Sequence, residues 1–221
     1  GGGSVVTGHR DGRLGFYDLE TGAMLMCVDK AHRGHVTTLS NLGMGATGGG
    51  QGCFITGGQD GFVRVWDTRV GAGTVRAVME VPAHRGPRGV GAVGGVIGIG
   101  GSAGVGIPGG VYRFASFGAD KRICIMDLRR ATAVEHIFEE HRDFIYCMDF
   151  VPTAADGSGG LGGGVLVTGG GDGMILVHDV ARGAMRLLYG LGCCSAGAVR
   201  CVVAHGNRML VGGDDGNAMM Y

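Results

Sequence analysis

Short apolar runs alternate with turns rich in glycine and aspartate along most of the chain. The run Phe62 to Trp66 alternates apolar and polar side chains, whereas the run Cys53 to Thr56 before it is short and apolar. A period of two predicts a β-strand with one buried face, and two such runs on either side of a tight turn predict a β-hairpin. We therefore expect the segment 53–66 to form a hairpin.

This hairpin pattern occurs five times, with an aspartate at the turn and a bulky side chain six residues after it. In four of the five copies a glycine follows the aspartate. Glycine reaches positive φ easily, and an aspartate can bond its own turn backbone. Repetition on this scale indicates a repeat fold. The turn aspartates are Asp11, Asp60, Asp120, Asp172 and Asp215, and the bulky residues are Tyr17, Trp66, Met126, His178 and Tyr221.

Two further apolar runs flank each hairpin, one after it, such as 134–138, and one before it, such as 144–150. Each unit then supplies four antiparallel strands, and the shortest interval between turn aspartates falls within the ~40–45 residues of a four-stranded propeller unit. We predict an all-β fold, a β-propeller of such blades. The approximate blade limits are 1–29, 30–81, 82–138, 139–190 and 191–221.

The repeats resemble the WD-repeat (WD40) β-propeller family, whose units carry a Gly-His pair, a turn aspartate and a Trp-Asp ending. Gly34-His35, Asp60 and Trp66-Asp67 match all three elements, and the pair weakens to Ala83-His84 and Glu140-His141 in later repeats. The resemblance implies a full ring of seven blades. About four and a half blades fall within this chain, so we expect a partial propeller.

In that family the turn aspartate, the histidine, a Ser or Thr on the second strand and the tryptophan form a buried hydrogen-bonded network. The resemblance implies that His35, Thr56, Asp60 and Trp66 form one here. Burying such polar groups is unfavourable unless each finds a partner, so a linked set can fasten a strand to its neighbours. The same structural role is expected for Asp11, Asp120, His141, Asp172 and Asp215.

A Ser/Thr, a His and an Asp could also form a hydrolase triad, but a hydrolase needs one set at one exposed place. Repetition favours a structural role, so we predict no catalytic residues and no enzyme activity. His178 stands where the family has tryptophan. We expect His178 to be a core or groove-lining histidine. One alternative is that it binds a ligand. Another is that it is a catalytic residue of an enzyme with a pocket at the mouth of the propeller channel.

The chain contains 50 glycines, many of them in three stretches at 43–52, 86–110 and 153–164. We expect these stretches to be insertions between the first and second strands of their repeats, emerging on one face and mobile. The opposite face should carry the hairpin turns and the connections between blades, and it is the better candidate for binding a partner. Its polar residues are His9, Arg10, His32, Arg33, Gln59, Arg85, Lys121, Arg122, Arg142 and Asp143.

The charge and the cysteine content of the chain bear on its binding partners and on its cellular compartment. The 19 basic side chains are balanced by 19 acidic ones without a basic tail, which does not favour nucleic-acid or membrane binding. The seven cysteines lack a C-x-x-C pair, which suits a reducing, intracellular compartment, cytoplasmic or nuclear. Cys193-Cys194 could be redox-active or bind a soft metal, although the motifs predict no metal and no cofactor.

We therefore expect a scaffold or adaptor that binds other proteins within a multiprotein complex. An alternative follows from a second resemblance, to the "WDxR" box of substrate receptors that dock onto the propeller adaptor of a cullin-RING ubiquitin ligase. The segments Trp66 to Arg69 and Met126 to Arg129 are similar to this box. In that alternative Arg69 and Arg129 bind the partner, because an arginine just past the strand can form paired bonds with a carboxylate.

Overall fold

The computed structural model describes residues 3–41, 52–68, 75–86, 89–99, 113–130, 133–152, 163–181, 183–194 and 197–221, and within them all regular elements are β-strands. The first sheet contains β1 (Ser4–Gly8), β2 (Leu14–Asp18) and β3 (Met24–Val28). The second contains β4 (Val36–Asn41), β5 (Cys53–Gly58), β6 (Val63–Asp67) and β7 (Ala77–Val81). The third contains β10 (Val93–Gly98), β11 (Arg113–Gly118), β12 (Ile123–Asp127) and β13 (Val134–Phe138).

The fourth sheet contains β14 (Ile145–Pro152), β15 (Gly164–Gly170), β16 (Met174–Asp179) and β17 (Arg186–Gly192). The fifth contains β18 (Val199–His205), β19 (Arg208–Gly213) and β20 (Ala218–Met220). A small ribbon of β8 (Arg85–Gly86) and β9 (Gly89–Val90) lies in the connection between the second and third sheets. Among the described residues, no helix is long and apolar enough to cross a membrane.

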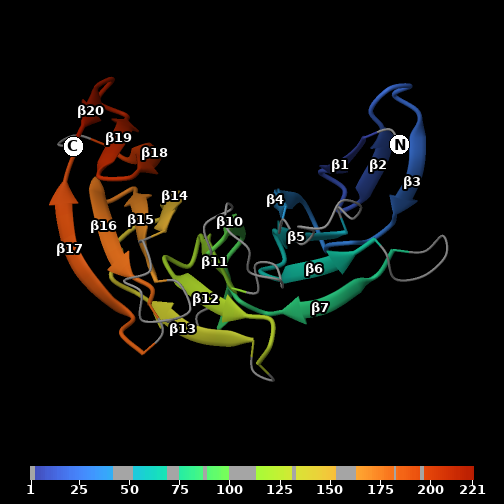
Figure 1. The fold of residues 1–221 in the computed structure, drawn as a ribbon, viewed down its shortest axis with the longest axis horizontal. Coiled ribbons are helices and arrows are strands. Elements are labelled where there is room, and N and C mark those ends of the chain that lie inside the picture. The colour runs from blue at the N-terminus through green and yellow to red at the C-terminus, as the bar shows by residue number, and fades with distance from the viewer. Residues whose placement is uncertain are drawn as a thin grey trace.

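Each sheet is an antiparallel meander in which consecutive strands pair, as expected of a propeller blade. The five sheets follow one another along an open arc, with β4, β10, β14 and β18 on its inside and β3, β7, β13 and β17 on its outside (Figure 1). The prediction of an all-β propeller architecture is therefore confirmed, and the arc is not closed.

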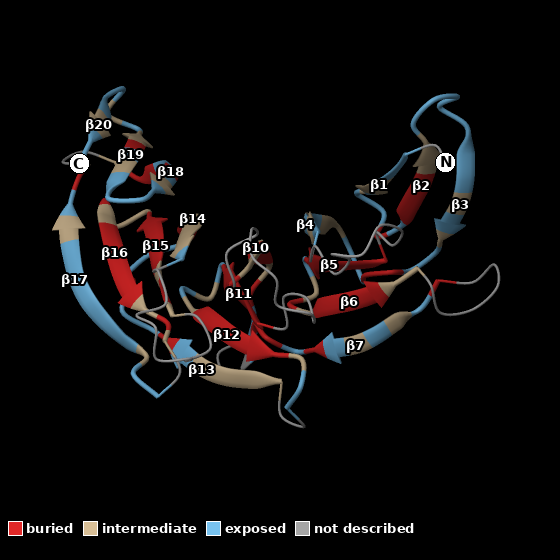
Figure 2. Ribbon diagram, viewed as in Figure 1, coloured by how far each residue is buried: buried red, intermediate tan, exposed pale blue. Residues whose placement is uncertain are grey.

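The core lies between neighbouring blades, where the faces of two sheets pack together. Its four clusters each join adjacent blades, as when Ile55 of β5 packs with Phe114 of β11 and Met126 of β12. The middle strands of the second, third and fourth blades are mostly buried, and the outer strands are mostly exposed or intermediate (Figure 2). Because each blade buries its faces only against its neighbours, stability comes from the sum of these interfaces.

The prediction that the whole of 86–110 is an insertion is wrong. Residues 93–98 form β10, the inner strand of the third blade, which pairs with β11. The glycines of this strand are a packing requirement, because a Cβ on Gly94 or Gly95 would overlap the ring of Phe117. Of the three glycine-rich stretches, the parts 43–51, 87–88, 100–110 and 153–162 lie outside the described residues.

Candidate functional site: the loop face and the networks that hold it

The second blade is joined to the loop that enters it by a buried hydrogen-bonded network. His32 places Nδ1 2.9 Å from Oδ1 of Asp60 and Nε2 2.7 Å from Oγ1 of Thr56, and Nε1 of Trp66 donates to that hydroxyl at 2.9 Å. His32, Thr56 and Trp66 are all buried. Arg64 adds a charge-assisted bond from its guanidinium to Oδ2 of Asp60 at 2.9 Å.

The third blade repeats this arrangement with His84. Its Nδ1 lies 2.8 Å from Oδ1 of Asp120, and its Nε2 lies 2.9 Å from Oγ of Ser116. Both ring nitrogens of His84 therefore have a partner, the carboxylate at Nδ1 and the serine hydroxyl at Nε2. The second carboxylate oxygen, Oδ2 of Asp120, has no hydrogen-bond partner among the described residues.

The fourth blade has the same set, with His141 placed 3.1 Å from Oδ2 of Asp172 and 2.9 Å from Oγ1 of Thr168. In the second and fourth blades the turn carboxylate also accepts the backbone N–H that follows the histidine, from Arg33 at 2.9 Å and Arg142 at 2.8 Å. Each network therefore clamps one connection between blades onto the hairpin turn of the next blade.

His35, which the Gly-His resemblance placed in this network, lies outside it. It is half-buried, and its Nε2 accepts a long bond from Nε of Arg10 at 3.4 Å. The prediction for His35 is wrong because the histidine that recurs in the networks belongs to a His-Arg motif, not to the Gly-His pair. The sequence A-H-R-G occurs at both 31–34 and 83–86, and E-H-R-D occurs at 140–143. Aligning these motifs identifies His32, which the Gly-His pair missed.

A glycine two residues before the turn aspartate makes room for each imidazole. A Cβ on Gly58 would overlap the ring of His32, and one on Gly118 or Gly170 would come within 2.6 or 2.7 Å of Nδ1 of the facing histidine. Real Cβ atoms do not approach other atoms so closely, so a buried histidine in this place requires a glycine opposite its ring.

The first and fifth blades depart from this pattern, and Asp11 faces no network of this kind within the described residues. In the first blade the glycine position holds His9, which lies 3.0 Å from Oγ1 of Thr7. Asp11 is exposed and pairs with Arg13 at 2.6 Å. In the fifth blade Asp215 accepts the N–H of its own turn at Asn217, and no histidine faces it among the described residues.

The networks of the second and fourth blades combine a charged carboxylate with a neutral imidazole. Burial opposes the charge of Asp60, but the N–H of Arg33, the ring of His32 and the guanidinium of Arg64 outweigh it and lower the pKa of Asp60 to about 2. Burial lowers the pKa of His32 although Asp60 opposes this shift. The pKa of His141 is lowered for the same reason. Burial therefore keeps these imidazoles neutral near pH 7.

Ser116, His84 and Asp120 have the distances of a hydrolase triad, yet Ser116 and His84 are 0% exposed. A buried hydroxyl cannot reach a substrate carbonyl, so the geometry supports a positional role. In the described part of the chain, His, Cys, Asp and Glu side chains form no group that could hold a metal ion.

His178, at the tryptophan position of the fourth blade, is a core residue. It is fully buried, its ring lies 4.4 Å from that of Phe138, and its Nε2 is 3.6 Å from Oε2 of Glu140. Neither ring nitrogen makes a hydrogen bond of good geometry within the described residues. Burial lowers the pKa of His178 to about 4, with the nearby His141 adding to the effect.

This burial predicts a loss of stability in acid. An unfolded histidine titrates near 6.5, so between pH 6.5 and about 4 the unfolded chain binds a proton that His178 in the folded chain does not. Stability is therefore highest above pH 6.5 and falls as the pH drops through this window. His178→Met, which copies the residue of the third blade, should flatten the curve of unfolding free energy against pH measured by denaturant titration. An unchanged slope would contradict this account.

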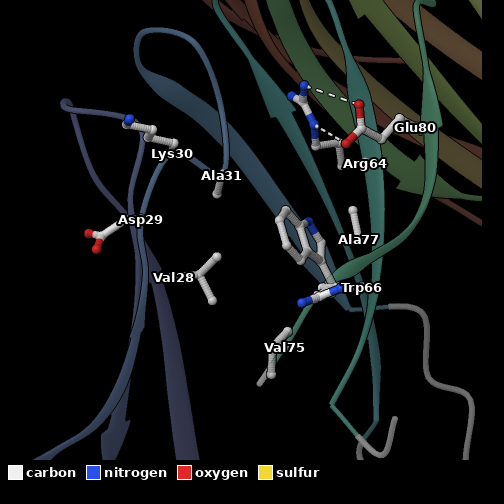
Figure 3. Close-up of a pocket in the computed structure, with 10 residues that line it drawn as sticks. Val28, Asp29, Lys30, Ala31, Arg64, Trp66, Val75, Ala77 and Glu80 are labelled. Carbon is white, nitrogen blue, oxygen red and sulfur yellow. Dashed lines mark hydrogen bonds and ion pairs between the residues drawn. The ribbon is translucent and has the colours of Figure 1, made fainter. Parts of the chain in front are cut away.

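A pocket of about 430 Å³ lies at the junction of the first two blades. Trp66 lies at its centre between Lys30 of the first blade's loop and Glu80 of β7 (Figure 3). Arg64, at the edge, is bonded to both Asp60 and Glu80, so its charge is already compensated.

Of the two arginines predicted to bind a partner, the structure describes Arg129 and not Arg69. Arg69 lies outside the described residues. Arg129 follows β12 at the end opposite the hairpin turns, with 41% of its side chain exposed. Its guanidinium makes two bonds of 3.1 Å to Asp127, whose side chain is buried. Arg129 is thus held against its own strand.

Comparison with known proteins agrees with this geometry. Residues 25–67 and 133–179, which include the network hairpins of the second and fourth blades, match the family model "WD domain, G-beta repeat". The fold is similar to the crystal structure of the computationally designed Ika8 protein, with a TM-score of 0.64 and 19% identity, covering 99% of this chain. The chain spans 55% of that protein's length. No curated protein matches the chain significantly in sequence. The two matched segments are WD repeats, and the blades that they form agree with a WD-repeat family.

Proposed function

We propose that the chain is a non-enzymatic protein-interaction scaffold whose partner docks on the loop face. The loop face is the end of the blades that carries the hairpin turns and the connections between blades. The observation that supports this proposal is the set of buried networks, which hold the connections between blades against the hairpin turns. A surface that is ordered before binding loses little entropy when a partner docks.

Backbone bonds between turns and loops support a rigid loop face. The N–H of Gln59 donates to the carbonyl of His35 at 2.9 Å, and the N–H of Gly171 donates to that of Phe144 at 2.7 Å. The N–H of Ala119 likewise donates to the carbonyl of Ala92 at 2.9 Å. Each turn is thereby tied to the loop that enters the same blade. Since a propeller offers loops rather than an inherent chemistry, its function follows from what docks on them.

The proposed location is the cytoplasm or nucleus, where other proteins of a multiprotein complex would be the partners. All seven cysteines are free thiols, and Cys27 and Cys201 are exposed. Exposed free thiols persist in a reducing compartment and are oxidised outside it, which favours the interior of the cell.

Site-specific photo-crosslinking tests the scaffold proposal. A photoreactive residue at Gln59, in a turn of the loop face, should form covalent adducts with other proteins in cell extract. The same residue at Asn207, in the turn between β18 and β19 at the opposite end of the blades, is the matched exposed control. Adducts at Asn207 as abundant as those at Gln59, or none at either position, would contradict docking on the loop face.

A second candidate function is the receptor of a cullin-RING ubiquitin ligase. It is favoured by the exposed guanidinium of Arg129 at the end of β12, within the box Met126 to Arg129. Because Arg129 is already bonded to Asp127, a partner carboxylate would have to share or replace that contact. In the same crosslinking experiment, a photoreactive residue at the neighbouring exposed Arg130 should capture the ligase adaptor. Its absence from those adducts would remove this candidate.

A further inference from the structure

We propose that the loop face binds an acidic segment of a partner protein through Arg33, Arg85 and Arg142. This inference rests on the proposed scaffold function and specifies the chemistry of the partner. The three residues, called here the arginine row, lie in the three connections that enter the second, third and fourth blades.

The arginines of the row occupy equivalent positions in successive repeats. Each directly follows the buried histidine of its network, at His32, His84 or His141. The network fixes the backbone beneath each arginine, while all three side chains are exposed. Within the described residues, none of the three guanidinium groups is in an ion pair with a carboxylate. Their charges are therefore available to an external anion.

The acids around the row are held by hydrogen bonds or ion pairs to other groups. The turn aspartates of these blades face imidazoles inside the networks. Glu139 is bonded to Arg122 at 2.6 Å. Asp143 accepts the N–H of Phe144 at 2.8 Å and points toward the turn of the fourth blade, since a Cβ on Gly171 would lie 2.9 Å from its Oδ2. The row thus presents three exposed guanidinium groups, while the neighbouring carboxylates are already occupied by hydrogen bonds or ion pairs of their own.

Two further cations extend this surface. Lys121, in the turn of the third blade, donates from Nζ to the carbonyl of Arg142 at 2.7 Å, which places its charge beside the row. Arg10, in the turn of the first blade, donates to the ring of His35 at 3.4 Å. These contacts leave both cationic charges uncompensated by acids within the described residues.

Aromatic side chains shape the surface for a peptide. The guanidinium carbons of Arg85 and Arg64 both lie over the ring of Phe62, 5.0 and 4.8 Å from its centroid. Such stacking holds a guanidinium in place while its N–H groups point outward to carboxylates. Phe144, beside Arg142, is 46% exposed and offers an apolar contact. The surface thus fits acidic side chains flanking an apolar one.

The row ends at the junction of the fourth and fifth blades. There Cys194 takes the place of the histidine, since a Cβ on Gly213 would lie 2.8 Å from its Sγ, and the next residue in the sequence is Ser195. The facing turn carries Asp214 and Asp215. The only cation bonded to that turn in the described residues, Arg200, is bound by Asp214 at 2.7 Å. An acidic segment is therefore expected across the first three junctions and not the fourth. A polynucleotide, which gains affinity from many phosphates, would need a longer basic surface.

Fluorescence anisotropy with labelled peptides tests the proposal. The probe is a peptide of alternating Asp and Glu residues around one Phe, compared with the same peptide in which Asn and Gln replace the acids. The test variant combines Arg33→Glu, Arg85→Glu and Arg142→Glu. The matched control combines Arg76→Glu, Arg186→Glu and Arg208→Glu, which reverse the same charge on exposed arginines near the opposite end of the strands.

The acidic probe should bind, lose affinity as salt rises, and bind the test variant at least about tenfold more weakly, with at most an about twofold change for the control. Equal melting temperatures of the two variants keep the comparison valid. Equal binding of the neutral peptide, equal loss in the control, or tighter binding of single-stranded RNA would overturn the proposal. Failure here with adducts still formed at Gln59 would reject the acidic chemistry and leave the scaffold function standing.

Discussion

Replacing His32 with alanine is expected to lower the free energy of unfolding by about 4 kcal/mol, whereas His35→Ala should change it by less than about 0.5 kcal/mol. The difference follows from what each histidine touches. Loss of the His32 ring leaves Asp60 and Thr56 with fewer partners in a buried site and opens a cavity between blades. Loss of the His35 ring removes one long, exposed bond to Arg10.

Guanidinium titration followed by the fluorescence of Trp66 measures this prediction. Trp66 is the single tryptophan and donates to Thr56 within the same network, so its signal reports on the second blade. His35→Ala serves as the matched control, because the two histidines are three residues apart in one loop. If both substitutions destabilise the chain equally, the network has been assigned to the wrong histidine.

Gly58→Ala is expected to destabilise the chain by about 3 kcal/mol, because a Cβ at this position would overlap the imidazole of His32 and lie 2.7 Å from Oδ1 of Asp60. The imidazole is held by its hydrogen bonds and cannot retreat without breaking them. The same substitution at Gly192 is the control. A Cβ there would meet only Sδ of Met174, at 3.8 Å, so a change within about 0.5 kcal/mol is expected.

A double-mutant cycle separates this clash from a general intolerance of alanine. In the His32→Ala background the ring is gone, so adding Gly58→Ala should destabilise much less than it does alone, with a coupling of about 2 kcal/mol. Additive effects of the two substitutions would show that the methyl group meets something other than the imidazole.

Much of the architecture could be predicted from local pattern. Short apolar runs before Gly/Asp turns and strand-like runs after them mark hairpins such as β5–β6 and β15–β16, because strand and turn preferences act over a few neighbouring residues. The turn aspartates and Thr56 and Trp66 were also identifiable, since they keep a constant spacing within one hairpin. Where composition masked the pattern, as in the glycine-rich β10, the strand was missed.

The sequence by itself determined the repeat, the antiparallel blades and the polar residue types that each turn supplies. Only the tertiary structure decided that His32 rather than His35 enters the network and that residues 93–98 complete a blade. The physical reason is distance along the chain. The bonded partners of each network histidine lie 24 to 36 residues away, across a sheet interface whose packing selects one register among several that local sequence allows.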